Sequence, residues 1–338
     1  MKICVVSFDF WHYDHYIIDE LLKKDISASH INIGNYSYAN IFERISNTCS
    51  KIFLGKNLKH INRQKYVRDS LESLGHQDQI LIMNPHTLAY ETIQYIKQHT
   101  GHLIAYLYDN LDRFPVQDKL HLFDKVYSFE DEDVKKYGFE KLTNYNYLVD
   151  FHHHKNVPEL DIFYITSYDK NRKIILKDLV NRFQQLNFKF KIVTVGKKVW
   201  KEQLRQFFFP KSKHTSCEFH RKPISHTQVL DAYHNTRVIL DLMRQDQTGL
   251  SFRVFEAMAL EKKMITNNPS IVHYDFYRPE NILVLNDEHS NLSVDFVSSP
   301  YVPIPDEIYH KYTLDNWVTQ VFNLSEKTYI NRITNRYL

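Results

Sequence analysis

Glycine is scarce in this sequence. Only 7 of the 338 residues are glycine, well below the usual share of about 7%. No G-x-G-x-x-G pattern follows a predicted strand and no Walker pattern occurs, so a dinucleotide dehydrogenase and a P-loop ATPase both lose their usual support. A phosphate group would therefore have to bind elsewhere, and helix N-termini offer free N–H groups and a partial positive charge.

Cysteines, excess charge and long hydrophobic runs are also few. Three cysteines lie far apart without CxxC spacing, which argues against a disulfide framework or structural zinc and favours a reducing cytoplasm. With 43 Lys and Arg against 40 Asp and Glu, the net charge gives no general reason to expect nucleic acid. No segment approaches the roughly 20 apolar residues of a membrane span.

Short apolar runs alternate with helical periodicity along the chain. ICVVSF, QILIMN and HLIAYLY predict buried strands in the first half, and DIFYITSY, FKIVTVG, VILDLM and KMITNN repeat the scheme in the second. Helical patterns such as TLAYETIQYIKQH separate them. We therefore predict an α/β protein with two parallel, helix-covered sheets. The expected domains are residues 1–152 and 158–312, followed by C-terminal helices in 313–338.

The stretch QTGLSFRVFEAMALEKKMITNN, residues 247–268, follows the predicted strand VILDLM. Gly249 permits a tight turn, and residues 251–260 predict a helix. The backbone amides of Gly249, Leu250 and Ser251 would then face the carboxyl ends of the strands, where open α/β sheets bind ligands. An anion is the ligand that such amides favour.

Arg253 and Glu256 lie one turn apart on this predicted helix. The arginine can make a bidentate contact to phosphate, and the glutamate can accept hydrogen bonds from a ribose diol. Together they predict a nucleoside diphosphate site. The alternative is a solvated surface pair, which contributes only tenths of a kcal/mol.

Other residues of the second half follow strands at the same edge of the sheet. Arg172 is a candidate for the second phosphate, with an exposed basic residue at a helix start as the alternative. Lys197 and Lys198 present the same choice. The backbone around Pro223 and Ile224 is expected to lie beside the base.

The segment WHYDHY places His12, Asp14 and His15 after the first strand. We expect no metal site, because adjacent loop residues rarely converge on one ion; the three histidines at 152–154 lie in the predicted linker. Asp14 is a candidate catalytic base, with an N-cap as the alternative, and the two histidines are candidates for acceptor binding.

The segment LYDNLDRFP places Asp109 at the end of another strand. A carboxylate there can take the proton of an attacking hydroxyl, so Asp109 ranks level with Asp14. Arg113 is expected to bind a carboxylate of the donor or acceptor, or to hold Asp109 in place. After the strand MITNN, the amides of Asn267 and Asn268 can reach donor hydroxyls, or simply form a turn.

These residues carry a resemblance. The stretch from Thr248 to Glu256 is similar to the donor-binding segment of GT-B fold glycosyltransferases. More narrowly, SFRVFEAMALEKKMITNNPSIVHYDFYRPENILVL resembles a bacterial group that builds lipopolysaccharide and capsule, as do SFDFWHYDHYIIDELL, LYDNLDRFP, FDKVYSFEDEDVKKYGF and YTLDNWV. Many retaining relatives carry a Glu where this chain has Thr248, which leaves retention or inversion open.

The resemblance implies two Rossmann-like domains facing across a cleft, with C-terminal helices crossing back to the first domain. It implies metal-independent transfer of a sugar from a nucleotide diphosphate sugar, most simply a UDP-sugar, to a surface glycan or lipid-linked acceptor. The expected location is the cytoplasm, at the inner face of the membrane. Two alternatives stay open: a nucleotide-sugar epimerase of the same architecture, and a catalytically inactive nucleotide-sugar-binding partner.

Overall fold

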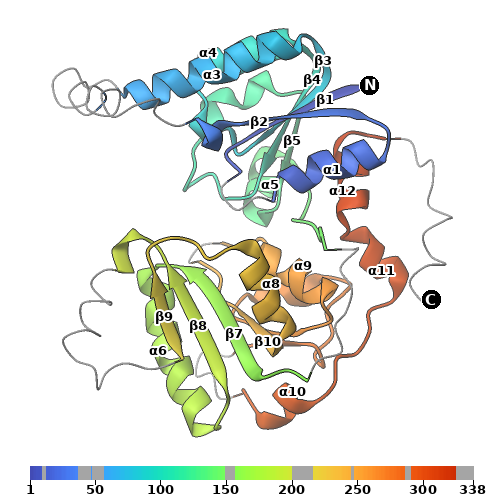
Figure 1. Cartoon of the computed structure of the whole chain (residues 1–338). Coiled ribbons are helices and arrows are strands. Elements are labelled where there is room, and N and C mark those ends of the chain that lie inside the picture. Colours follow the sequence, from blue (N-terminus) through green and yellow to red (C-terminus); the bar gives the residue numbers. More distant parts are fainter. Residues whose placement is uncertain are drawn as a thin grey trace. The chain divides into compact units, whose positions relative to one another are not determined.

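The computed structural model describes residues 1–9, 13–36, 47, 57–148, 157–199, 216–244, 247–285 and 291–324. The chain divides into two compact units (Figure 1). Unit 1 comprises Met1–Thr143 and Leu314–Leu338, and unit 2 comprises Asn144–Thr313. The sequence placed the boundary in the polar segment after 152. Residues 149–156, which include the three consecutive histidines, lie outside the described residues.

Unit 1 contains a six-stranded parallel sheet in the order β2-β1-β3-β4-β5-β6. Its strands are β1 (Lys2–Ser7), β2 (Ser27–Asn32), β3 (Gln77–Met83), β4 (Thr100–Leu107), β5 (Lys125–Ser128) and β6 (Glu140–Lys141). Its helices are α1 (His15–Lys23), α3 (Leu58–Leu74), α4 (Tyr90–Gln98), α5 (Asp131–Tyr137) and α12 (Leu314–Val321).

The central strands of unit 1 contain runs of consecutive buried apolar residues because helices cover both faces of a parallel sheet. Ile3, Cys4, Val5 and Val6 of β1 have no exposed surface. Each fully buried aliphatic side chain contributes roughly 1.5–3 kcal/mol relative to an exposed one. The continuous apolar run that predicted a strand therefore also supplies the core against α3 and α4.

Helix α12 belongs to unit 1. Trp317 is 2% exposed, its indole Nε1 donates to the carbonyl oxygen of Thr143 at 3.1 Å, and its ring packs edge-on against Tyr106. The Tyr127 hydroxyl donates to the carbonyl oxygen of Gln320 at 3.0 Å. Residues 325–338, also predicted to be helical, lie outside the described part of the chain.

Unit 2 contains the second six-stranded parallel sheet, in the order β12-β11-β10-β7-β8-β9. Its strands are β7 (Leu160–Ser167), β8 (Phe190–Val195), β9 (Cys217–His220), β10 (Thr236–Asp241), β11 (Lys263–Thr266) and β12 (Ile282–Val284). Its helices are α6 (Lys170–Gln185), α8 (His226–His234), α9 (Phe252–Ala259), α10 (Val294–Ser298) and α11 (Asp306–Lys311). The predicted strands of both halves are all present.

The two faces of the unit 2 sheet are covered by different helices (Figure 1). Leu179 and Phe183 of α6 share one core cluster with Val297 of α10 and the strand residues between them, while α8 and α9 pack on the strands from the other side. Because all strands of this sheet are parallel, their strand-to-helix turns lie at one edge. The carboxyl ends of β7 and β10, which are neighbours, meet there.

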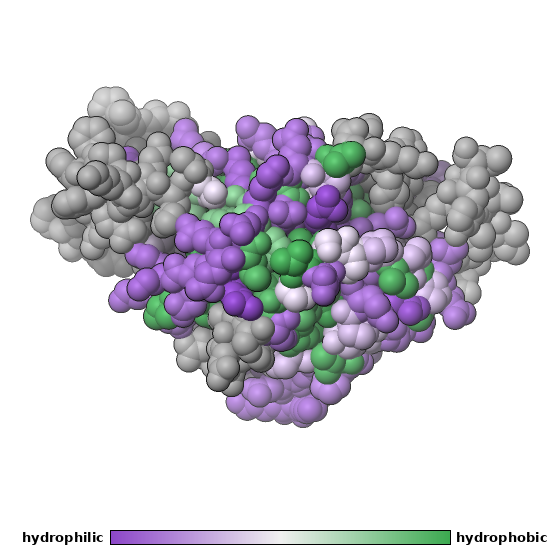
Figure 2. Space-filling model, turned by 90° about the horizontal axis from the view of Figure 1, so that it is seen from below, coloured by the Kyte–Doolittle hydropathy of each residue, from purple (hydrophilic) through white to green (hydrophobic). Residues whose placement is uncertain are grey.

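Single large hydrophobic residues are exposed on the surface, among them Ile174 of α6 and Val294 of α10. On the face drawn in Figure 2, hydrophobic residues lie mainly near the middle and are bordered by hydrophilic ones. Isolated exposed apolar residues are normal for a folded domain. None of the described helices combines the length and apolar character needed to cross a bilayer.

Candidate functional site

The start of α9 is the centre of the site in unit 2. Ser251 is its N-cap, with extended backbone angles, and a serine in this position usually caps the amides of the first turn. Here the Ser251 hydroxyl donates instead to Oδ1 of Asp241 at 2.9 Å, and the side chain makes no cap hydrogen bond. The amides of the first turn are thus left uncapped by this side chain, at the positive end of the helix.

Arg253 extends from the first turn of α9 toward the end of β10. Its Nη1 lies 2.7 Å from Oδ1 of Asp241 in an ion pair, and its guanidinium lies over the Tyr164 ring at 5.3 Å. Its side chain is 20% exposed, whereas that of Asp241 is 4% exposed. The Arg253 side chain is therefore partly accessible to solvent, and the buried carboxylate of Asp241 holds its guanidinium group in place.

Arg172 comes from the first turn of α6. The helix begins at Asp169, whose carboxylate accepts from the amides of Asn171 and Arg172. The Arg172 side chain donates through Nη1 to the Thr166 hydroxyl at 2.7 Å, and the residue is 7% exposed. Within the described chain its Nε has no hydrogen-bond partner. The alternative expectation, an exposed basic residue, is wrong.

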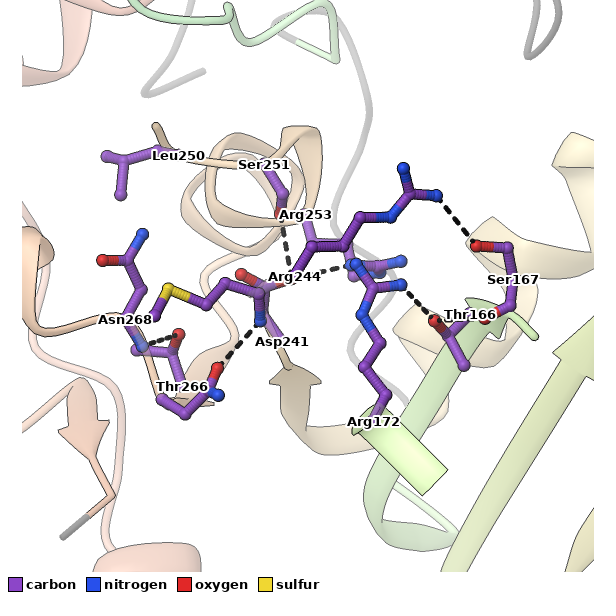
Figure 3. Close-up of polar contacts among 12 residues, drawn as sticks. Thr166, Ser167, Arg172, Asp241, Arg244, Leu250, Ser251, Arg253, Thr266 and Asn268 are labelled. Atoms are coloured by element: carbon purple, nitrogen blue, oxygen red, sulfur yellow. Dashed lines mark hydrogen bonds and ion pairs between the residues drawn. The ribbon is translucent and has the colours of Figure 1, made fainter. Parts of the chain in front are cut away.

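A third arginine, Arg244, follows β10 and donates to the Ser167 hydroxyl at 3.3 Å. Figure 3 shows the guanidinium groups of Arg172, Arg244 and Arg253 gathered above the carboxyl ends of β7 and β10. The carboxylate of Asp241 forms an ion pair with one of the three, Arg253. Among the described side chains labelled in Figure 3, three guanidinium groups and one carboxylate leave about two positive charges, which suits a diphosphate.

Neighbouring strands hold the loop between β10 and α9 in place. Asn268, at the end of β11, donates to the Thr248 carbonyl at 3.0 Å, and the Ser270 hydroxyl donates to the same oxygen at 2.7 Å. Asn144 donates to the carbonyl of Leu250 at 2.9 Å. Asn267 accepts from the amide of Met243 at 2.8 Å. The two asparagines at the end of β11 therefore form turn and loop contacts, the alternative that the sequence left open.

Glu256 is buried on α9, with 2% of its surface exposed. Its Oε1 accepts a hydrogen bond from the Tyr147 hydroxyl at 2.5 Å, and this hydroxyl lies 2.7 Å from Nε2 of His226. Arg253 pairs with Asp241 instead of Glu256. The alternative of a solvated Arg253–Glu256 surface pair is therefore wrong, while a ribose contact by Glu256 stays a prediction.

The turn before α8 contains Ile224, which is half-buried. Ser225 caps α8 through a capping box with Gln228, which fixes the chain direction at this turn. The expected contact of this backbone with a base stays a prediction. Lys197 lies in a short 3₁₀ helix after β8, at the same edge of the sheet.

In unit 1, Asp14 immediately precedes α1 and is 4% exposed. Its side chain makes no cap hydrogen bond, although its amide donates to Oδ1 of Asp9 at 3.0 Å. Burial, reinforced by the nearby Asp9 carboxylate, raises the pKa of Asp14 to about 7. Asp14 occupies the N-cap position without acting as a side-chain cap, and it is poised to exchange a proton near neutral pH.

Asp109 follows β4 and forms an ion pair with Arg113, whose Nη1 lies 2.7 Å from its Oδ1. Burial raises the pKa of Asp109, against the opposing effect of Arg113. Arg113 also lies over the Phe114 ring at 4.6 Å. Of the two roles predicted for Arg113, the structure shows the one in which it holds Asp109.

The acceptor-binding role predicted for His12 and His15 stays a prediction. His12 lies outside the described residues, and His15 begins α1 with its ring 4.0 Å from that of Tyr16. Sequence reasoning did not select His86, which follows β3 and stacks on Phe114 at 4.0 Å. Burial lowers its pKa, with Asp109 acting in the opposite direction. Its position just after a strand, in NPH, was the available signal. The described residues contain no group of His, Cys, Asp or Glu arranged to hold a metal ion.

Comparison with known proteins agrees with this architecture. Residues 172–295, most of unit 2, match a family model described as glycosyl transferase-like. The span contains all three arginines and Glu256. No curated protein sequence matches the chain at a significant level.

Solved structures match over nearly the whole chain. OtsA in its apo form has a TM-score of 0.58 at 11% identity, covering 96% of this chain and 98% of that one. The lipopolysaccharide outer core galactosyltransferase WaaB, also apo, has a TM-score of 0.52 at 12% identity, covering 96% and 99%. The chain has the GT-B fold. A UDP-GlcNAc 2-epimerase from Methanocaldococcus jannaschii, in complex with UDP-GlcNAc and UDP, shares this fold, with a TM-score of 0.54 at 14% identity and coverage of 96% and 99%. The fold alone therefore does not separate transfer from epimerisation.

Proposed function

We propose that this protein is a glycosyltransferase that moves a sugar from a nucleoside diphosphate sugar, a UDP-sugar, to a hydroxyl group of an acceptor. The observation that carries the proposal is the convergence of Arg172, Arg244 and Arg253 near the start of α9. The match of residues 172–295 to a glycosyl transferase-like family supports it.

The arginines stabilise the leaving group in this mechanism. Negative charge develops on the diphosphate as its bond to the sugar breaks, and preorganised donors at that position lower the barrier. Arg253 is already oriented by Asp241, and Arg172 by Thr166. Both guanidinium groups are therefore held in place before the reaction starts. Little of their electrostatic stabilisation is lost in ordering the two side chains.

Asp14 is the proposed general base. Its pKa of about 7 lies near the operating pH, where a carboxylate can accept a hydroxyl proton and later release it. Asp109 is the weaker candidate because its oxygen is occupied by Arg113. His15 and Arg113 are proposed to lie beside the acceptor.

The acceptor that we propose is a bacterial surface glycan on a lipid carrier, which would bring the protein to the inner face of the membrane. The segments that resemble lipopolysaccharide and capsule enzymes support this choice. The proposed reaction uses the nucleotide sugar as co-substrate and requires no metal ion or further cofactor.

Thermal unfolding in the presence of nucleoside diphosphates tests the donor site. A ligand at a hundred times its Kd raises the free energy of unfolding by about 2.7 kcal/mol, which shifts Tm by about 5 to 10 °C for a domain of this size. We expect UDP to give this shift and Arg253→Ala to abolish it.

Arg237→Ala is the matched control. This arginine lies on β10 at the other end of the strand and contacts Asp161 at 3.5 Å, so its loss should leave the UDP shift unchanged. An equal loss in both variants, or no shift with any nucleoside diphosphate in the wild type, would refute the donor site.

Epimerisation is the second candidate because an epimerase shares the fold. Incubating the protein with a UDP-sugar and no acceptor separates the two reactions. A transferase should leave the sugar unchanged apart from slow hydrolysis to UDP, whereas an epimerase should convert it to an isomer that chromatography resolves.

A further inference from the structure

Glu256 lies at the inner end of a three-residue hydrogen-bond chain in unit 2. The Tyr147 hydroxyl is 2.5 Å from Oε1 of Glu256 and 2.7 Å from Nε2 of His226. Exposure rises along the chain, from 2% for Glu256 to 9% for Tyr147 and to a half-buried His226. The chain therefore connects a buried carboxylate with the surface at the start of α8.

With Glu256 ionised, the number of protons determines the direction of these hydrogen bonds. The Tyr147 hydroxyl has one proton, and an ionised Glu256 can only accept. Tyr147 therefore donates to Glu256, and its oxygen accepts from an Nε2–H of His226. Hydrogen bonds to a buried charge are stronger than neutral ones, so this arrangement fixes both the tautomer of His226 and the rotamer of Glu256.

Tyr147 is itself held by its neighbours against the donor helix. Phe252, at the start of α9, packs edge-on against the rings of Tyr145 and Tyr147 at 5.1 and 6.4 Å. Asn144 donates to the carbonyl oxygen of Leu250, just before α9, at 2.9 Å. Segment 144–148 thus contacts the start of α9 at more than one point, and Tyr147 presents its hydroxyl to Glu256 from there.

We propose that Tyr147 and His226 are positioning residues that hold the carboxylate of Glu256 for the 2′ and 3′ hydroxyls of a ribose. This inference rests on the proposed donor site and assigns the residues that would make this site prefer a ribonucleoside diphosphate over its deoxy counterpart. A carboxylate can accept about four hydrogen bonds, so the bond from Tyr147 is compatible with two more from a diol. A ligand without the 2′ hydroxyl cannot use the oriented carboxylate fully.

Binding of UDP and of 2′-deoxy-UDP to the full chain, measured by calorimetry, tests this role. We expect the wild type to prefer UDP by about tenfold, the effect of one hydrogen bond to a charged group. Tyr147→Phe keeps the ring packing but removes the hydroxyl, so UDP affinity should fall to the level of 2′-deoxy-UDP while that of 2′-deoxy-UDP changes little. His226→Leu should weaken the preference, and His226→Gln should restore it because a side-chain N–H is again available.

Tyr309→Phe is the control, because it removes a hydroxyl that contacts Asn146, the residue next to Tyr147. It should keep the preference for UDP. Equal losses for both nucleotides in Tyr147→Phe, or an unchanged preference, would overturn the positioning role and leave the donor site standing. Absence of binding by either nucleotide to the wild type would overturn the donor site and this inference with it.

Discussion

At the scale of single residues, the two candidate carboxylates of unit 1 differ in their surroundings. Burial raises the pKa of Asp109, and its ion pair with Arg113 opposes this effect. Asp14 is more deeply buried and lies near Asp9, and its pKa is raised to about 7. When the surroundings of two carboxyl groups give them different pKa values, one of them commonly becomes the proton-transfer group.

Asp14→Asn is expected to reduce kcat by a hundredfold or more, within the range for a lost general base, with little change in the Kd for UDP. In the wild type kcat should rise as the pH increases through about 7, because only the ionised carboxylate accepts a proton. A kcat unaffected by the substitution, with Asp109→Asn inactive instead, would transfer the role to Asp109.

The same carboxyl group also links pH to stability. Its pKa is about 7 in the folded protein and 3.8 ordinarily, so the folded state binds the proton more tightly than the unfolded chain. The free energy of unfolding should therefore fall as the pH rises from about 4 to 7. Asp14→Asn should remove this decline, which denaturant titrations would show as a stability advantage of the variant over the wild type that is larger at pH 8 than at pH 5.

At the scale of elements, the sequence predicted the strands and the helix start of the site, but not the contacts that hold them. Arg172 and Arg253 were recognisable because each begins a helix after a buried strand. Asp241 was hidden inside the apolar run VILDLM, and Arg244 in the loop behind it. Tyr147 contacts Glu256 across 109 positions of sequence, a distance over which periodicity carries no information. A serine at this position normally caps the helix, but the Ser251 hydroxyl donates to the carboxylate of Asp241 at the end of β10.

Helix α3 illustrates the opposite limit. It spans 17 residues but buries only Gln64, Val67 and Leu71, so its amphipathic signal is weak and it was not among the helical patterns found in the sequence. Asn57 caps it, accepting from the amide of His60 at 3.3 Å. Here length and capping determine the helix, whereas a narrow apolar stripe is enough to dock it on the sheet.

At the scale of the whole molecule, two units with separate cores should respond separately to perturbation. Trp317→Ala removes a buried indole from unit 1 and its hydrogen bond to Thr143, a loss of about 3–5 kcal/mol. In scanning calorimetry the variant should lower one unfolding transition, and UDP should raise the other. A single transition that moves with both changes would show that the units unfold as one cooperative block.

The return of residues 314–324 to unit 1 has a consequence for biosynthesis. The ribosome completes the sheet of unit 1 early, but Trp317 is added only after all of unit 2 has been made. Domains tend to fold as they emerge from the ribosome. Unit 2 can therefore reach its native state before α12, whose Trp317 packs on Tyr106, has joined the sheet of unit 1.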